Sequence, residues 1–280
     1  MLRWDNLTMT LKTHASKSRG KLVPDPKDMQ GRVALISGGS DGIGLATAAV
    51  LAERGAKVAI CARNPERLER ALVELQSVSE VEAHSLDVSD LTGFTRLVED
   101  IARRHGRLDM LVNNAFSNSY GAIADLGIEQ WQRDFAVNAD AVFVGTKAAM
   151  AVMMAQGHGS IVNIASTNGI RAAAGMSSYS ASKAALVHFT ACAAMEGAPA
   201  GVRVNAIAPG MVMTAAVEDY MRHFGDLVER TVAAIPMQRA GQPREIAEAI
   251  AFLLSDAASF VTGITLPVDG GKSVQLHLPG

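Results

Sequence analysis

From residue 32 onward, short apolar segments typical of buried strands alternate with longer segments whose apolar residues recur at helical spacing. The predicted strands cover 32–37, 57–62, 81–86, 108–114, 159–166, 203–209 and 264–271. The predicted helices cover 42–55, 64–76, 90–106, 128–156, 177–197 and 243–255, and the fourth could be broken near Asn138. The strands are apolar along their whole length, as in parallel sheets covered on both faces. The pattern predicts an α/β fold, a doubly wound parallel sheet of seven strands with helices on both faces.

The chain shows no internal repeat and no linker after Gly31, so we expect a single domain at residues 29–280. Residues 1–28 differ, because they are polar, carry Pro24 and Pro26 and have no helical period. They also lack the apolar core of a secretory signal. We expect a loosely ordered arm there.

Charge and cysteine content exclude several kinds of partner. The formal net charge is -2, which gives no general attraction to nucleic acid or to acidic membranes. No stretch approaches the roughly 20 apolar residues of a membrane-spanning helix. The two cysteines, Cys61 and Cys192, lie far apart and have no neighbours at metal-ligand spacing. We therefore expect no metal site and no disulfide framework, and a cytoplasmic location.

The segment SGGSDGIG occupies positions 37–44, between the first predicted strand and the first predicted helix. Gly38, Gly42 and Gly44 give the spacing G-x-x-x-G-x-G. At this turn of a doubly wound fold, missing side chains let the backbone approach a pyrophosphate, which the free N–H groups at the helix start attract. The alternative is a tight turn with close helix–strand packing and no ligand. The position favours a dinucleotide site and a Rossmann-like fold.

The segment YSASK places Tyr179 and Lys183 on one face of a predicted helix, just beyond a strand that ends at Ser166. Ligands of such folds bind at this carboxyl edge of the sheet. A lysine ammonium ~4 Å away could lower the pKa of a tyrosine by up to about 3 units. Such a tyrosine could exchange a proton with an alcohol or carbonyl oxygen, and the Ser166 hydroxyl could hold the same oxygen.

Together with further motifs in the same order, these segments make the chain resemble the single-domain branch of the short-chain dehydrogenase/reductase (SDR) family over residues 31–271. The further matches are Asp87 in LDV, Asn113 and Ala115 in NNA, Asn138 in FAVNADAVF, and Pro209, Gly210 and Thr214 in RVNAIAPGMVMT. The resemblance implies an NAD(P)(H)-dependent oxidoreductase that interconverts a secondary alcohol and a ketone.

The resemblance also implies a role for each catalytic position. Tyr179 would be the general acid/base, and Lys183 would lower its pKa and bind the nicotinamide ribose. Ser166 would orient the substrate oxygen, and Asn138 would hold a water in a proton relay. The implied cofactor-binding residues are Gly38, Ser40, Asp41, Gly42, Ile43, Gly44, Arg63, Asp87, Val88, Asn114, Ala115, Tyr179, Lys183, Pro209, Gly210, Val212 and Thr214.

The end of the second predicted strand, KVAICARN, bears on the choice of cofactor. Relatives that prefer NAD usually carry a carboxylate there, but this chain has Ala62 followed by Arg63. The Arg63 guanidinium suits the 2′-phosphate of NADP. Asp41 could oppose that phosphate, or it could turn away and cap the helix start. We predict a preference for NADP(H), with NAD(H) as the alternative.

The substrate is less constrained. Phe116 stands where relatives usually carry glycine, and its ring could face the substrate cleft together with Met176 and Met211. One alternative function is a 3-oxoacyl-thioester reductase, although the Arg-Asp pair of such relatives is absent from FSNSYGAIADL. An alternative of another class is a non-catalytic cofactor-binding sensor or scaffold. By analogy with relatives, the protein is expected to be a homotetramer.

Overall fold

In the computed structural model, seven parallel strands form one sheet within the described residues, which are 27–76, 78, 80–215, 217 and 229–275. The order across the sheet is β3-β2-β1-β4-β5-β6-β7. The strands are β1 Val33–Ser37, β2 Lys57–Ala62, β3 Val81–Ser85, β4 Met110–Asn113, β5 Gly159–Ile164, β6 Val202–Pro209 and β7 Thr265–Val268. The predicted Rossmann-like sheet is confirmed. Residues 1–26 of the expected arm lie outside the described residues.

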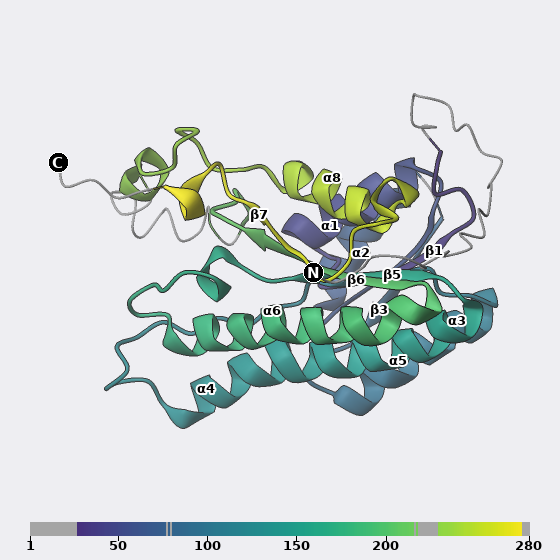
Figure 1. Cartoon of the computed structure of the whole chain (residues 1–280), viewed down its shortest axis with the longest axis horizontal. Coiled ribbons are helices and arrows are strands. Elements are labelled where there is room, and N and C mark those ends of the chain that lie inside the picture. The colour runs from purple at the N-terminus through teal and green to yellow at the C-terminus, as the bar shows by residue number, and fades with distance from the viewer. Residues whose placement is uncertain (1–26, 77, 79, 216, 218–228, 276–280) are drawn as a thin grey trace, which may run out of the picture.

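Helices cover both faces of the sheet (Figure 1). The α-helices are α1 Gly42–Glu53, α2 Pro65–Gln76, α3 Leu91–His105, α4 Ile128–Phe135, α5 Ala141–Gln156, α6 Ser177–Gly197 and α8 Pro243–Leu254. On one face α1, α2 and α8 bury a core against the sheet that includes Leu51, Ile60 and Ile250. On the other face α3, α5 and α6 bury a second core that includes Phe94, Leu111 and Met153. The strands are apolar throughout because both of their faces are buried.

The long helical region from Ile128 to Gln156 continues through the expected break near Asn138. Its helical path widens there into one π-helical turn, Ala136–Asp140, between α4 and α5. π-Helical turns are rare in proteins, and those that occur are often at functional sites. The helix from Ile128 to Gln156 is long enough and apolar enough to cross a membrane, judged by its most apolar 18-residue window. Within the fold, 44% of that window is buried.

The carboxyl ends of the strands lie at the same level, because the register aligns Ser37 with Asn113 and Asn113 with Asn163. The chain reverses its direction of travel across the sheet between β1 and β4, which are neighbours in the sheet order. In open parallel sheets, ligands bind outside the carboxyl ends at such a switch point. The segments that carry the predicted site therefore leave the sheet side by side.

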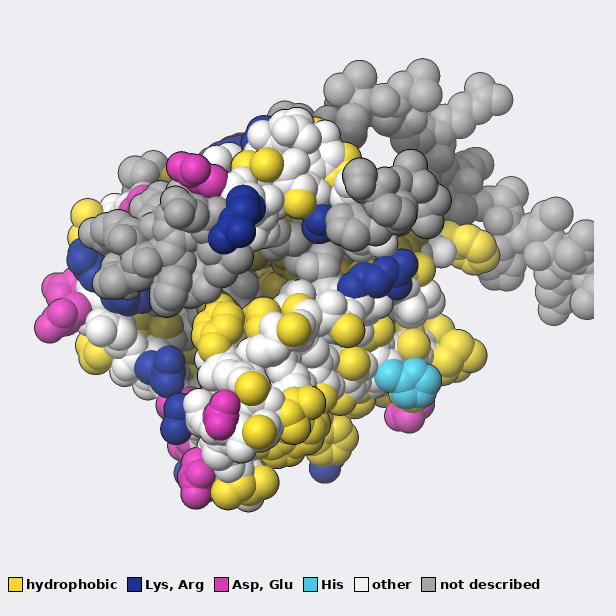
Figure 2. All heavy atoms as spheres, turned by 90° about the vertical axis from the view of Figure 1, so that its left-hand side faces the viewer, with side chains coloured by type: hydrophobic (Ala, Val, Ile, Leu, Met, Phe, Trp, Pro, Cys, Tyr) yellow, Lys and Arg dark blue, Asp and Glu magenta, His cyan; other side chains and the backbone are white. Residues whose placement is uncertain are grey.

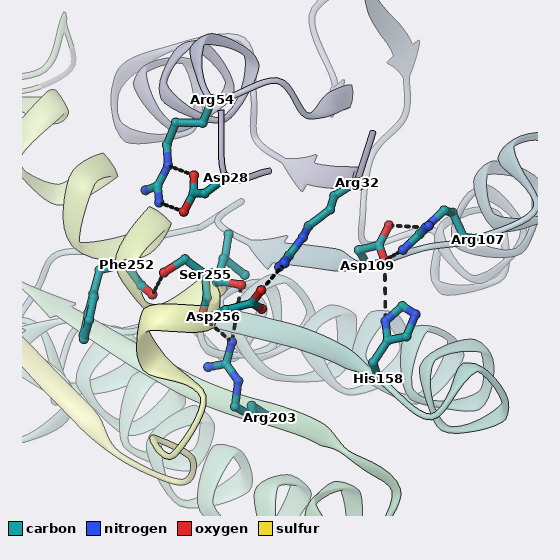
Figure 3. A network of polar contacts seen from close by, with 11 residues as sticks. Asp28, Arg32, Arg54, Arg107, Asp109, His158, Arg203, Phe252, Ser255 and Asp256 are labelled. Carbon is teal, nitrogen blue, oxygen red and sulfur yellow. Dashed lines mark hydrogen bonds and ion pairs between the residues drawn. The ribbon is translucent and has the colours of Figure 1, made fainter. Parts of the chain in front are cut away.

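Ion pairs lie at the opposite end of the strands, where the strands begin (Figure 3). Asp28, assigned to the arm from the sequence, accepts hydrogen bonds of 2.8 and 2.5 Å from Arg54 at the end of α1. Asp109, just before β4, accepts from Arg107 at 2.8 and 2.5 Å and lies 3.5 Å from Nδ1 of His158. These contacts stabilise the strand starts and lie at the far end of β4 from the predicted site.

Candidate active site

The glycine-rich turn after β1 needs its glycines for conformation and for space. Gly38 and Gly42 have φ of 66° and 53°, in the left-handed region that favours glycine. A side chain at Gly44 would collide with the carbonyl oxygen of Gly38 and would lie 2.6 Å from Nδ2 of Asn114. That amide donates to the carbonyls of Ser37 and Gly38, both at 3.0 Å. Close packing, the alternative raised by the sequence, is therefore present.

The same turn also presents the start of α1 at the switch point. Asp41 is the N-cap residue, and its carboxylate accepts from the N–H of Gly42 at 2.7 Å. The other N–H groups of the first turn, including those of Ile43 and Gly44, have no acceptor inside the helix. Thr214, after β6, lies against Gly42, where an added Cβ would be 3.1 Å from its methyl group. The turn thus fits a pyrophosphate approached from the β6 side.

Ser166 and Tyr179 lie at the carboxyl edge beyond β5. Ser166 follows the strand by two residues and caps a short 3₁₀ turn, accepting from the N–H of Asn168 at 3.1 Å. Tyr179 lies in the first turn of α6, which begins at Ser177. A hydrogen bond links the two side chains, and it favours the phenolate form. A serine and a tyrosine that share one hydrogen bond can both approach a single substrate oxygen.

Lys183 lies one helical turn after Tyr179 and is almost completely buried. Its ammonium donates to the carbonyl oxygen of Ile164 at 2.7 Å and lies 5.8 Å from the centre of the Tyr179 ring. Burial lowers the pKa of Lys183 to about 7, and the charge of Asp134 acts in the opposite direction. The amine is therefore close to the midpoint of its titration at neutral pH.

The expectation that Lys183 lowers the pKa of Tyr179 stays a prediction. Burial raises the pKa of Tyr179, the hydrogen bond with Ser166 lowers it, and the nearby Tyr120 and Asp134 raise it. The Lys183 ammonium donates to the Ile164 carbonyl, and its own pKa is lowered by burial. In the chain without cofactor, the net shift of the Tyr179 pKa is therefore upward.

Asn138 lies at the π-helical turn and contacts two segments at once. Its Nδ2 donates to Oγ of Ser182 at 2.9 Å and to the carbonyl of Ser117 at 2.7 Å. Its Oδ1 accepts from the N–H of Ser117 at 3.0 Å. Ser182 in turn donates to the carbonyl of Tyr179 at 2.8 Å. Sequence reasoning found Asn138 but missed Ser117 and Ser182, which connect it to the loop after β4 and to α6.

The residues expected around the adenosine ribose form two ion pairs. Arg63 after β2 lies 3.7 Å from Asp87 after β3. Arg67, in the first turn of α2, lies 3.4 Å from the carboxylate of Asp41. All four side chains are substantially exposed, so these pairs are weak and can be exchanged for a ligand. Asp41 thus caps α1 and also contacts a cation that the sequence analysis had not singled out.

Asp87 is held by its own loop as well as by Arg63. Ser89 donates to its carboxylate through N–H at 2.9 Å and through Oγ at 2.8 Å. Burial would raise the pKa of Asp87, but these hydrogen bonds and the charge of Arg63 lower it overall. The carboxylate is therefore available, ionised, at the edge where the resemblance implies an adenine.

The remaining cofactor-binding candidates line the same edge. Ser40 lies in the glycine turn, Val88 is buried after β3, and Ala115 follows β4. Pro209 ends β6, Gly210 packs against Asp269, and Val212 is buried. Asn113, quoted with the NNA motif, is different, because its amide points into the fold and donates to Asn163 at 2.8 Å. It supports the sheet, whereas Asn114 supports the glycine turn.

The three substrate candidates occupy different environments. Phe116 is 54% exposed, so its ring does not pack into the core. Met176 precedes α6, and its sulfur accepts a hydrogen bond of 3.1 Å from Asn168. Met211 lies beside a small cavity of about 90 Å³ that Met237 and Asp269 also line. Figure 2 shows the face that carries the carboxyl ends of the strands, with hydrophobic side chains gathered over its lower middle part.

Known proteins resemble this chain over most of its length. A family model described as enoyl-(acyl carrier protein) reductase matches residues 38–273. The chain is 38% identical to 2,5-dichloro-2,5-cyclohexadiene-1,4-diol dehydrogenase LinX of Sphingobium indicum over 247 residues, which covers 88% of this chain and 98% of that protein. It is 36% identical to the 3-oxoacyl-[acyl-carrier-protein] reductase FabG of Thermotoga maritima, with 87% of this chain and 98% of FabG covered.

Solved structures show the same relationship. The crystal structure of levodione reductase superposes with a TM-score of 0.84 at 35% identity, covering 89% of this chain and all of that chain. NAD⁺-bound xylitol dehydrogenase superposes with a TM-score of 0.83 at 32% identity, covering 87% of this chain and 99% of that one. An actinorhodin polyketide ketoreductase with NADPH gives 0.83 at 36% identity, covering 87% and 98%.

The chain therefore belongs to the short-chain dehydrogenase/reductase family. It is an oxidoreductase that acts on CH–OH groups and interconverts a secondary alcohol and a ketone with NAD(P)(H). Its substrate is a small molecule. The proposed non-catalytic sensor or scaffold is thereby excluded.

Proposed function

We propose that Ser166, Tyr179, Lys183 and Asn138 form the reaction site of this oxidoreductase. The observation that carries the proposal is their convergence at one edge of the sheet. Tyr179 shares a hydrogen bond with Ser166, and Asn138 reaches α6 through Ser182 at 2.9 Å. Lys183 lies one turn further along the same helix.

The chemistry is divided between the cofactor and the chain. A bound nicotinamide supplies or accepts the hydride. In the direction of reduction, the Tyr179 hydroxyl donates its proton to the ketone oxygen, and the Ser166 hydroxyl holds that oxygen through a hydrogen bond. In oxidation, the phenolate takes the proton of the alcohol. The Lys183 ammonium stabilises the phenolate once it turns from the Ile164 carbonyl toward the site.

Asn138 completes the site from the side of α5. Its amide is fixed by Ser117 and Ser182, so its position is set before any substrate binds. Tyr179 regains its proton through Lys183 and a water held next to Asn138. The π-helical turn makes this contact possible, because it shifts the Asn138 backbone relative to a regular helix.

The substrate class is tested with a panel of cyclic and open-chain ketones, each offered with NADH and with NADPH and followed by nicotinamide absorbance. We propose that small apolar ketones and their secondary alcohols are turned over, because hydrophobic side chains are exposed on the face that carries the site. LinX and cyclopentanol dehydrogenase, to which the chain is similar, are named for cyclic substrates. If the protein turned over none of the small apolar ketones in the panel, this substrate class would be rejected.

The second candidate is a 3-oxoacyl-thioester reductase, which the similarity to FabG favours. A carrier protein or coenzyme would need a basic surface near the site entrance. The loop from Phe116 to Leu126 contributes no arginine or lysine to that entrance. A 3-oxoacyl thioester added to the same panel decides between the two, since only this candidate predicts a higher kcat/KM for the thioester than for the free ketones.

The proposed cofactor preference is NADP(H), and it can be tested at Arg63. Its ion pair with Asp87 is long and exposed, so a 2′-phosphate can replace the carboxylate as the partner of the guanidinium. Arg63→Ala should weaken NADPH binding by about 10-fold or more, as loss of a charge-assisted contact of about 1.5–3 kcal/mol does. NADH binding should change by only a few-fold. The dissociation constants are measured by nicotinamide fluorescence.

Arg70 offers a matched control, because it is an exposed arginine further along α2. Arg70→Ala should leave the ratio of the two affinities unchanged. Equal affinity of the wild-type protein for NADH and NADPH, or a preference for NADH, would contradict the proposal. Asp41→Arg is less clean as a test, since it also removes the cap of α1 and the partner of Arg67.

We also propose a homotetramer. Large hydrophobic side chains are exposed on the helices that pair in relatives, namely Phe143 on α5, Met195 on α6 and Phe252 on α8. Phe143 to Asp should shift the sedimentation coefficient of the protein toward that of a smaller species, because a charge would then lie in the interface. A wild-type protein that sediments as a monomer at micromolar concentration would contradict the tetramer. The cytoplasmic location expected from the sequence stays a prediction.

A further inference from the structure

Asp134 is a buried carboxylate that the roles given above leave unexplained. It lies on α4, four residues before Asn138, and its side chain is completely buried. Among the described residues, no lysine, arginine or histidine lies within ion-pair distance of it. An isolated buried charge is costly, so the fold must hold it for a reason.

Four hydrogen bonds replace the missing cation. Oδ1 accepts from the hydroxyls of Ser117 at 2.8 Å and Ser119 at 3.2 Å. Oδ2 accepts from the N–H of Ser119 at 3.0 Å and from the hydroxyl of Ser178 at 2.6 Å. An ionised carboxylate only accepts hydrogen bonds, and here every contact is donated to it. The charge is therefore solvated by the protein in place of water.

These partners belong to the elements that form the reaction site. Ser178 directly precedes Tyr179 in the first turn of α6. Ser117 is bound at the same time by Asn138, through the two hydrogen bonds of its backbone. Asp134 thus connects the start of α6 to the loop after β4. It binds the side chain of Ser117, and Asn138 binds the backbone of the same serine.

The charge of Asp134 also acts on both proton-carrying groups. It raises the pKa of Lys183 against the effect of burial, and it raises the pKa of Tyr179 in the same direction as burial and Tyr120 do. Apart from Arg203 at the start of β6, which is partly buried, the other charged groups on the elements packed against α6 are exposed to solvent, which screens them. These groups are Glu129 and Arg133 on α4, Asp140 at the π-helical turn, Lys147 on α5 and Arg171 before α6.

We propose that Asp134 is a positioning residue of the reaction site, which ties Ser117 and the first turn of α6 together and supplies the buried negative charge that retains the proton on Lys183. The proposal rests on the assignment of Tyr179 and Lys183 as the proton-carrying groups. Asp134 does not touch the substrate oxygen, and it acts through Ser178, Ser117 and its electric field.

Asp134→Asn separates charge from shape, because an asparagine can keep the same contacts. Its Oδ1 can accept from Ser119 N–H and from Ser178, and its Nδ2 can donate to the Ser117 and Ser119 hydroxyls, which also accept. Removal of a negative charge lowers the pKa of every acid near it, whichever of the coupled groups titrates. Both limbs of the pH profile of kcat/KM should therefore move to lower pH. The proton concentration at each midpoint should rise by about tenfold or more.

Asp109→Asn is the matched control. Asp109 is also a buried carboxylate, but it is at the start of β4 with Arg107 and His158 (Figure 3), remote from the site. This variant should lose stability without moving the pH profile. Asp134→Ala, which loses the contacts as well as the charge, should show the same shift as Asp134→Asn together with a further fall in kcat.

A second measurement does not depend on turnover. The tyrosinate absorbance of the protein is titrated with pH, and the signal of the corresponding Tyr179→Phe protein is subtracted, which leaves the titration of Tyr179. Asp134→Asn should move this titration to lower pH, and Asp109→Asn should not. An Asp134→Asn protein that folds and titrates as the wild type does would overturn the proposal. Full turnover by Tyr179→Phe would instead reject the assignment of Tyr179, and the absorbance titration would still report on Asp134.

Discussion

Tyr179→Phe is expected to lower kcat by about 10²–10⁴-fold, the usual contribution of a general acid or base. The substitution removes the hydroxyl that shares a hydrogen bond with Ser166 and keeps the ring that packs at the start of α6. Because the ring remains, cofactor affinity should stay within a few-fold of the wild-type value. Steady-state kinetics with the best ketone of the panel measure kcat, and nicotinamide fluorescence measures the affinity.

If the variant kept more than about a tenth of the wild-type kcat, Tyr179 would be rejected as the proton donor. The loss of kcat would then be smaller than a general acid or base usually contributes. Ser166→Ala distinguishes the two members of the pair. It should reduce turnover as well, but it should leave the phenol of Tyr179 titrating at higher pH, because the hydrogen bond that lowers its pKa is lost.

Lys183→Met is expected to change the pH dependence of stability of the protein without cofactor. The pKa of Lys183 is about 7 in the folded chain, whereas it is near 10.4 in an unfolded one. Between these values the unfolded chain binds the extra proton, so wild-type stability gains up to about 5 kcal/mol as pH rises through this window. Below the window the ammonium is charged in both states, and the cost of burying it is fully present.

The difference in unfolding free energy between Lys183→Met and the wild type isolates this contribution, because other titrating groups cancel. The variant should be more stable relative to the wild type at pH about 6 than at pH about 10. Denaturant unfolding at fixed protein concentration measures both, and turnover by the variant should be lost throughout. Parallel pH profiles of the two proteins would show that Lys183 is not titrating with a lowered pKa.

The order of the secondary-structure elements follows closely from the sequence. The helix predicted at 177–197 has those bounds in the structure, and the predicted strand 57–62 is β2. Strand ends were less predictable. The segment 264–271 contains only four strand residues, Thr265–Val268, because the Asp269 side chain then bonds the backbone of the following turn at Gly271 and Ser273.

The residues proposed for the site came from the sequence as well, because several motifs occur in a fixed order at the ends of successive strands. The motifs did not reveal which group each side chain contacts or how its pKa is shifted. Lys183 and Tyr179 are four residues apart, and that spacing alone predicted a lowered tyrosine pKa. The structure shows the ammonium on the Ile164 carbonyl instead, since a buried cation takes the nearest strong acceptor.

The sequence by itself determined the parallel sheet, the glycine turn and the positions of Ser166, Tyr179, Lys183 and Asn138, because these depend on local periodicity and on the spacing of residues along the chain. Only the tertiary structure decided which distant groups meet them. Arg67 reaches Asp41 across 26 positions, and Asp134 reaches Ser178 across 44. No periodicity records such contacts, since the first arises from how the starts of α1 and α2 lie together and the second from how α4 packs against α6. Burial, which sets the pKa values of the site, comes from that packing as well.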